Sequence, residues 1–194
     1  VTAFIYSGLP DRHLWLSAII AARFLASAFA SGPSLLIIFC QITERFTSFK
    51  PGREPVRALS VIVLYAFSAN IFFLLLAVFP SFYSGIPSYR HPLVYLFAGI
   101  EGYSAMAPLM GASSVLAIVS LVLLLIPATR YNNIFLNIAV TGVILSIWID
   151  KGFAFIPAGF IPNPMNQVTE YMPTTPELVI SLGKKSKDRC DKLG

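Results

Sequence analysis

Residues 14–42 read LWLSAIIAARFLASAFASGPSLLIIFCQI, an apolar run with one charged side chain, Arg23. Crossing the hydrocarbon core of a bilayer takes about 20 apolar residues, so this stretch predicts a membrane-spanning helix. The whole chain agrees, because 56% of its 194 residues are hydrophobic and 12% are charged. A soluble domain averages roughly 45–50% apolar and 25% charged residues. We therefore expect the excess apolar surface to face lipid.

Three further apolar stretches complete a predicted membrane bundle. They cover residues 58–79, 106–126 and 134–149. The last is about 24 Å long as a helix, shorter than the roughly 30 Å hydrocarbon core, unless it continues through Asp150 and Lys151 to Ile156. A short apolar piece at residues 93–105 suits an interfacial or re-entrant helix. The predicted fold class is all-α, a polytopic transmembrane helix bundle with four spans and such short helices between them.

The formal net charge of +5 lies mostly in a tail. Residues 1–183 carry nine basic and seven acidic side chains, whereas residues 184–194 carry five basic and two acidic ones. The composition argues against a nucleic-acid-binding domain and against a disordered chain. Cys40 and Cys190, the two cysteines, show no metal-binding or redox spacing.

The charge of the loops predicts an orientation in the membrane. Five basic residues fall on the side of the loop at residues 43–57, and three fall on the opposite side. The first set is Arg45, Lys50, Arg53, Arg57 and Arg130, and the second is Arg12, Arg90 and Lys151. Because cytoplasmic loops carry the excess of Lys and Arg, the loop at residues 43–57 is predicted to be cytoplasmic.

Arg23 is the first candidate for a functional polar residue. A guanidinium inside a bilayer costs about 2.5–3.5 kcal/mol on insertion scales. One interpretation is a buried ion pair, with a functional or structural role. The other is that the side chain snorkels to the nearer interface, about 14 Å away along the helix.

Asp150 and Lys151 end the fourth span in the sequence SIWIDKGFAFIPAGFIP. They could form a solvated interfacial pair beside Trp148, a residue type typical of that depth. If the span continues, Asp150 is an intramembrane carboxylate, for which a proton or ion path is the usual hypothesis. Gly142 and Ser146 precede Asp150 at intervals of four residues, which leaves room on that face for water or a partner helix.

Glu101 is the last candidate, flanked by Ile100 and Gly102 in an apolar connection. It could take up protons or contact a quinone headgroup, or it could be an exposed loop acid. The histidines, His13 and His91, lie at span boundaries, which does not favour a transmembrane haem. The sequence contains no Walker, Rossmann, HExxH or GxSxG motif.

Two groups of strings in the chain resemble the NrfD or polysulfide reductase membrane-subunit family. The strings are VTAFIYSGLPDRHLW with AARFLASAFASGPSLLI, and WIDKGFAFIPAGFIPNPMNQVTEYMPTTPE. They are most similar to the DsrP-like branch, the integral membrane subunit of the sulfite-reduction-associated electron transport complex. On this resemblance, residues 1–183 are expected to be the carboxy-terminal transmembrane bundle of a larger membrane subunit. Residues 184–194 are expected to be a basic tail, truncated or atypical.

The resemblance implies an electron-transfer role. Subunits of this kind carry no metal ligated or cofactor covalently bound in their own chain, and use menaquinone or ubiquinone as substrate. They pass electrons between the quinone pool and an iron-sulfur, ferredoxin-like partner subunit in the bacterial or archaeal cytoplasmic membrane. Arg23, Glu101, Asp150 and Lys151 fall in or near the recognisable strings and are candidates for a proton path or buried polar cluster.

Two other functions remain open on the sequence. The broken region between Pro92 and Gly111 is also compatible with half of a secondary transporter. The chain could equally be a membrane anchor without a redox role. In each case its partners include membrane lipid and exclude nucleic acid, and the chain is not expected to catalyse a reaction alone.

Overall fold

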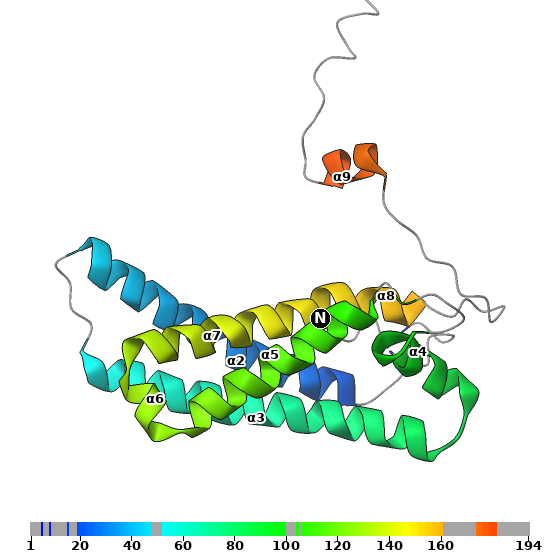
Figure 1. The fold of residues 1–194 in the computed structure, drawn as a ribbon, viewed down its shortest axis with the longest axis horizontal. Helices are drawn as coiled ribbons and strands as arrows, with labels where there is room; N and C mark the ends of the chain where they lie inside the picture. The colour runs from blue at the N-terminus through cyan, green and yellow to red at the C-terminus, as the bar shows by residue number, and fades with distance from the viewer. Residues whose placement is uncertain are drawn as a thin grey trace, which may run out of the picture.

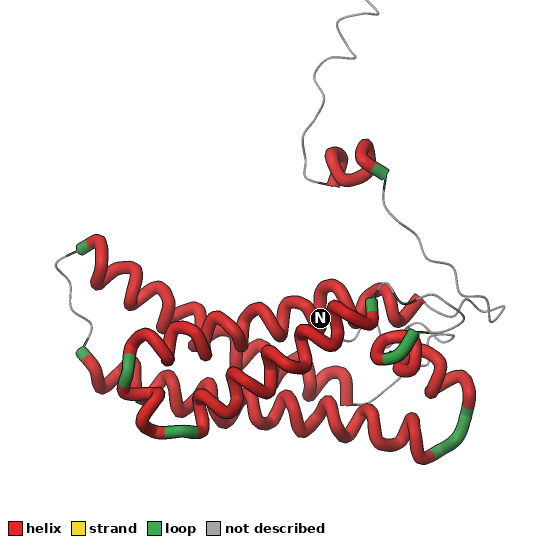
Figure 2. The backbone as a smooth tube through the Cα atoms, viewed as in Figure 1, coloured by secondary structure: helices red, strands yellow, loops and turns green. Residues whose placement is uncertain are grey.

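The computed structural model describes residues 5, 8, 15, 19–47, 52–99, 104, 106–160 and 174–181. Every regular element within these residues is a helix, which confirms the all-α fold class (Figure 2). In chain order the helices are α2 (Ile19–Phe46), α3 (Arg53–Tyr83), α4 (Pro87–Phe97), α5 (Ala107–Leu125), α6 (Pro127–Tyr131), α7 (Asn133–Trp148), the π-helix η1 (Ile149–Ala154), α8 (Phe155–Phe160) and α9 (Thr175–Ser181).

Within the described residues, four helices are long and apolar enough to cross a membrane: α2, α3, α5 and the continuous unit of α7 with η1. The third agrees closely with the predicted residues 106–126. Helix α2 ends four residues beyond its predicted end, and α3 extends four to five residues beyond both of its predicted ends. Apolar composition marks only the hydrocarbon core, whereas the helical hydrogen-bond pattern continues into the polar headgroup region, so the sequence underestimated the length of α3 and placed the end of α2 too early.

The fourth span is longer than residues 134–149, because helix runs without interruption from Asn133 to Ala154. Its 22 residues correspond to about 33 Å, enough for the roughly 30 Å core. The extension through Asp150 and Lys151 is therefore the correct alternative. Both residues lie inside the span rather than after it.

The four spans form a bundle in which each helix touches two neighbours (Figure 1). Helix α2 packs against α3 and α7, and α5 packs against the same two helices. A short loop joins α2 to α3, and α6 joins α5 to α7, so each of these pairs is antiparallel. This arrangement brings residues from the start of the chain beside residues near position 150.

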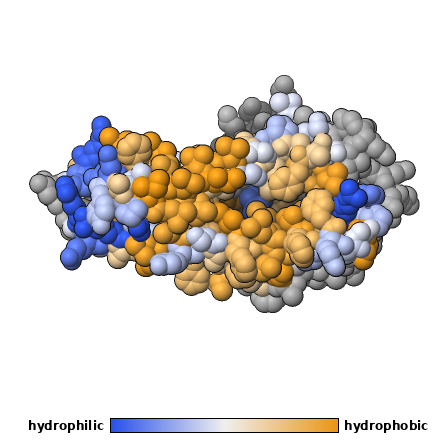
Figure 3. All heavy atoms as spheres, turned by 60° about the horizontal axis from the view of Figure 1, so that its bottom comes forward, coloured by the Kyte–Doolittle hydropathy of each residue, from blue (hydrophilic) through white to orange (hydrophobic). Residues whose placement is uncertain are grey.

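The apolar side chains are divided between a small core and a large outer surface. The core is formed by Ala30, Ile37, Val63, Phe67, Leu124, Leu136, Ala139, Val140, Val143 and Ile147. Many other large apolar side chains, such as Leu25, Phe29 and Phe72, are exposed. They form a hydrophobic band between two polar ends (Figure 3). Exposed apolar surface of this extent fits contact with lipid.

Short helices occur between the spans, as predicted, but both bounds of one of them differ. The predicted piece at residues 93–105 corresponds to α4, which begins earlier, at Pro87, and ends after Phe97. Proline is favourable in the first turn of a helix because its missing amide is not needed there. Gly99 follows with a φ of 80°, and its amide bonds the carbonyl of Val94. That left-handed conformation ends the helix.

Helices α5 and α7 approach each other through small residues. The Ser113 hydroxyl on α5 donates a hydrogen bond to the Ser146 carbonyl of α7 at 3.1 Å. A Cβ atom added to Gly142 would overlap Ser120 Oγ. Small residues permit this close backbone contact, which stabilises helix pairs in membranes where no hydrophobic driving force is available.

We expect Gly142→Ala to destabilise the bundle by about 1–3 kcal/mol, the usual cost of overpacking. In Ser120→Ala/Gly142→Ala the nearest atom of residue 120 would be Cβ, at 3.5 Å, so the double variant should recover most of the loss. Thermal unfolding in detergent measures both effects. Gly111→Ala is the control, because no atom lies within 4 Å of the added Cβ. Equal stability of all three variants would contradict the close contact.

Candidate functional site

Arg23 on α2 and Asp150 on η1 form an ion pair inside the bundle. The Arg23 Nη2 atom donates to both oxygens of the carboxylate, at 2.7 Å to Oδ1 and 2.8 Å to Oδ2. Each residue is only 8% exposed. A charge-assisted contact of this length is strong, and it connects the first span to the fourth.

Lys151 contacts the same carboxylate. Its Nζ atom is 3.2 Å from Asp150 Oδ2, an ion pair without the alignment of a hydrogen bond. The ammonium also lies 5.0 Å from the centre of the Phe24 ring and 5.8 Å from that of Phe155. Both distances are in the range of cation–π attraction. We call Arg23, Asp150 and Lys151 the charged triad.

The charged triad depends on the π-helical turn of η1. In this turn the Phe155 amide bonds the carbonyl of Asp150, five residues back. A π turn holds more residues than an α turn, so consecutive side chains are separated by a smaller angle. Asp150 and Lys151 can therefore both point into the bundle. Such turns are rare and frequently occur at functional sites.

The two cations of the charged triad are not fully satisfied by one carboxylate. Arg23 Nε and Lys151 Nζ are buried and have no hydrogen-bond partner among the described residues. The local charge is therefore +1 in a region of low dielectric constant. An unbalanced buried charge is costly, and intramembrane charges usually face a polar partner or a water-filled space.

A small cavity adjoins Asp150 and extends between α3, α5 and α7. Its volume is about 30 Å³, and its polar lining comes from Asn70, Ser113, Ser114, Ser146 and Asp150. A cavity needs roughly 10–15 Å³ of this measure to hold one water, so the space can hold about two. The Asn70 Oδ1 atom is buried and has no partner in the described structure. A water in the cavity has polar groups to bond.

Aromatic residues cover the charged triad on the other side. Trp15 is fully buried, and its Nε1 atom donates to the Phe155 carbonyl at 3.2 Å. The ring of Phe155 meets that of Phe24 edge to face, with centroids 5.4 Å apart. A Cβ atom on Gly159 would overlap the Trp15 ring, so glycine is needed at that contact. This packing separates the charges from the apolar exterior.

The structure brings together three of the four residues that the sequence indicated. Arg23 is paired with Asp150 and does not snorkel to an interface. Asp150 and Lys151 are buried or half-buried in a helix and do not form a solvated boundary pair. Glu101 lies outside the described residues. A role of these residues in proton transfer stays a prediction.

Sequence reasoning did not assign a role to Asn70, Phe24 or Phe155. Asn70 had a visible signal, because it is the only strongly polar residue within residues 58–79. The two phenylalanines had none, since the chain contains 16 of them and their importance comes from position. Only the fold shows which ones contact Lys151.

A double-mutant cycle tests the central ion pair. Neutralising Asp150 leaves two buried cations without a counter-ion, which is strongly destabilising, whereas neutralising Arg23 removes the shorter contact and leaves Asp150 paired with Lys151 alone. We expect Arg23→Gln and Asp150→Asn each to lower unfolding stability, and the double variant to show a coupling of about 0.5–3 kcal/mol, typical of residues in direct contact. Thermal unfolding of the purified chain provides the values.

The matched control is Arg90→Gln, which removes an exposed arginine on α4. Combined with Asp150→Asn, it should give an additive result. Additivity of Arg23→Gln with Asp150→Asn would show that the two side chains do not interact in the folded protein.

A comparison with protein families matches most of the chain. The family model described as "Polysulphide reductase, NrfD" matches residues 1–161. No curated protein and no solved structure matches the chain. The matched region contains all four spans and the charged triad. The chain therefore belongs to the NrfD polysulphide reductase family and is a multi-pass membrane protein.

Proposed function

We propose that this protein is a membrane subunit of a quinone-linked oxidoreductase complex. In this role it passes electrons between the menaquinone or ubiquinone pool and an iron-sulfur partner subunit, in the cytoplasmic membrane of a bacterium or archaeon. Membership of the NrfD family supports the proposal. No residue of this chain is assigned as a quinone ligand.

We further propose that the charged triad conducts protons during turnover. The observation that carries this step is the buried Asp150 carboxylate, held between two cations on a π turn and open to a polar cavity. A carboxylate accepts and releases protons, whereas a guanidinium keeps its charge. Asp150, together with the neighbouring Lys151 ammonium, is therefore the exchanging group, and Arg23 holds the carboxylate in place.

The arrangement suggests a route for the proton across the bundle. Water in the cavity would connect Asp150 with Asn70 and with the serines of α5. The Lys151 ammonium also lies against the rings of Phe24 and Phe155. It can move between these rings and the carboxylate when the charge of Asp150 changes. Intramembrane chains of acidic groups and water are the usual elements of proton relays.

The complex reconstituted in proteoliposomes tests the proton role. We expect Asp150→Asn to reduce quinol-driven turnover and the associated proton release by at least tenfold, given the range of about 10²–10⁴ supplied by a positioned acid or base. Glu54→Gln is the control, since it neutralises an exposed carboxylate in the first turn of α3. It should leave both rates unchanged.

Assembly of the variant complex must be checked by co-purification, because loss of the subunit would also lower turnover. If the Asp150→Asn complex assembles and keeps its turnover and proton release, the charged triad has no part in the proton path. Arg23→Lys is a further variant for the same assay, because lysine keeps the positive charge but lacks the planar guanidinium with its paired donors.

Deletion tests the redox assignment itself. We expect a strain without this subunit to lose quinol oxidation by the complex, and the tagged subunit to co-purify with an iron-sulfur protein. Absence of such a protein together with unchanged quinol oxidation would contradict the proposal. Substrate uptake into proteoliposomes without redox partners would instead favour a transporter.

A further inference from the structure

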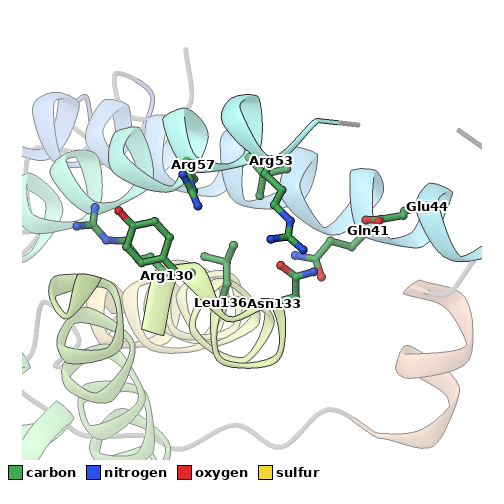
Figure 4. A pocket seen from close by; sticks show the side chains of 9 residues that line it. Gln41, Glu44, Arg53, Arg57, Arg130, Asn133 and Leu136 are labelled. Atoms are coloured by element: carbon green, nitrogen blue, oxygen red, sulfur yellow. The ribbon is translucent and has the colours of Figure 1, made fainter. Parts of the chain in front are cut away.

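A second polar site lies at the opposite end of the bundle from the charged triad. Four helices, α2, α3, α6 and α7, surround a pocket of about 70 Å³ (Figure 4). Gln41 on α2 lines it, and Arg23 lies on the same helix 18 residues earlier, about 27 Å away along the axis. The two sites are therefore separate, and a ligand of this pocket is independent of the proposed function.

The pocket is strongly basic. It is lined by three arginines from two elements, Arg53 and Arg57 on α3 and Arg130 on α6. Glu44 is the only acidic side chain of the lining, and in Figure 4 it lies at the far side of Gln41, away from Arg57 and Arg130. The described residues include no ion pair between Glu44 and any of these arginines. The lining therefore keeps a net charge of +2.

Arg53 and Arg57 are exposed and Arg130 is half-buried, but neighbouring side chains contact or face two of them. The Arg57 guanidinium lies 4.4 Å from the centre of the Tyr131 ring, a cation–π contact. The Arg53 side chain points toward Gln41 and Asn133 (Figure 4). Tyr131 and Asn133 also line the pocket. All three arginines line this pocket, and in Figure 4 Arg53 and Arg130 lie on opposite sides of Arg57.

The pocket also has a hydrogen-bond donor without a partner. The Nε2 atom of Gln41 is buried and makes no hydrogen bond in the described structure. A buried unsatisfied donor costs about 1–3 kcal/mol, and an acceptor placed in the pocket would remove that cost. Three guanidinium groups and an amide donor are the chemistry that recognises phosphate oxygens.

The helix ends do not by themselves decide the sign of the ligand. Helices α3 and α7 begin at the pocket, with Arg53 and Asn133 as their first residues, whereas α2 ends near it. The negative end of α2 offsets one of the two positive ends, so the helix dipoles leave only a partial positive charge. The preference for an anion therefore comes mainly from the side chains.

The location selects a lipid as the source of the phosphate. The pocket lies at the ends of the spans, among the first residues of α3 and α7 and the last turns of α2, and Val56 and Leu136 form apolar parts of its lining. Basic pockets between transmembrane helices at this depth suit anionic lipid headgroups. We infer that this pocket binds the phosphodiester headgroup of an anionic phospholipid, through Arg53, Arg57, Arg130 and Gln41.

Native mass spectrometry of the full chain in neutral detergent tests this inference, with phosphatidylglycerol and phosphatidylcholine as probes. We expect phosphatidylglycerol to bind at least tenfold more tightly. A basic residue near an anionic lipid surface contributes about fivefold in affinity, so Arg53→Gln/Arg130→Gln should weaken phosphatidylglycerol binding about 25-fold. Circular dichroism verifies that the double variant keeps its helical content.

Arg45→Gln is the matched control, because Arg45 lies in the last turn of α2 at the same end but does not line the pocket. It should change the affinity less than twofold. Equal weakening by Arg45→Gln, or no weakening by the double variant, would overturn the inference.

Two further measurements distinguish a phospholipid from other ligands of the pocket. Displacement of phosphatidylglycerol by millimolar inorganic phosphate would assign the pocket to free phosphate and overturn the lipid assignment. If the double variant keeps its affinity for phosphatidylglycerol but loses co-purifying subunits, the pocket binds a protein instead. Persistence of lipid binding in phosphate, with co-purification unchanged, supports the inference.

Discussion

The ion pair between Arg23 and Asp150 is the contact on which the arrangement of the bundle depends. A lone charge in an apolar bundle is expensive, and pairing it with an opposite charge at 2.7 Å offsets much of that expense. The pairing is possible only if α2 lies beside the end of the fourth span. The electrostatic requirement and the helix packing therefore agree on one topology, in which α7 has both α2 and α5 as neighbours.

The π turn, the small residues of α5 and α7 and the aromatic side chains around this ion pair each help to position it. The π turn directs two consecutive residues, Asp150 and Lys151, inward. Small residues on α5 and α7, such as Gly142, permit a close contact just before that turn. Trp15 and Phe155 cover the charges from the other side. The charged triad thus has an apolar cover on one side and a polar cavity on the other, an arrangement suited to exchange with water from one direction.

The two ends of the bundle differ in how their charges are used. At the end with the charged triad, two cations and one carboxylate are buried and in contact. At the other end, Arg53, Arg57 and Arg130 surround an open pocket, where Glu44 provides little neutralisation. Cations near the headgroup region remain accessible to water and lipid, so their proximity is tolerated without internal pairing. The same residue type therefore supports an internal contact in one place and an external ligand in the other.

The amino-acid sequence by itself determined the membrane-spanning class, the four spans found among the described residues and the residues that are costly to bury. These follow from composition and local order, because the transfer of apolar and charged side chains into lipid depends little on tertiary contacts. The strings around Arg23 and Trp148 also indicated the family. The tertiary structure alone decided that Arg23 meets Asp150, that the fourth span continues through a π turn, and that Asn70 shares a cavity with them. Those facts depend on which faces of distant helices pack together, and spacing along one helix carries no information about its partner.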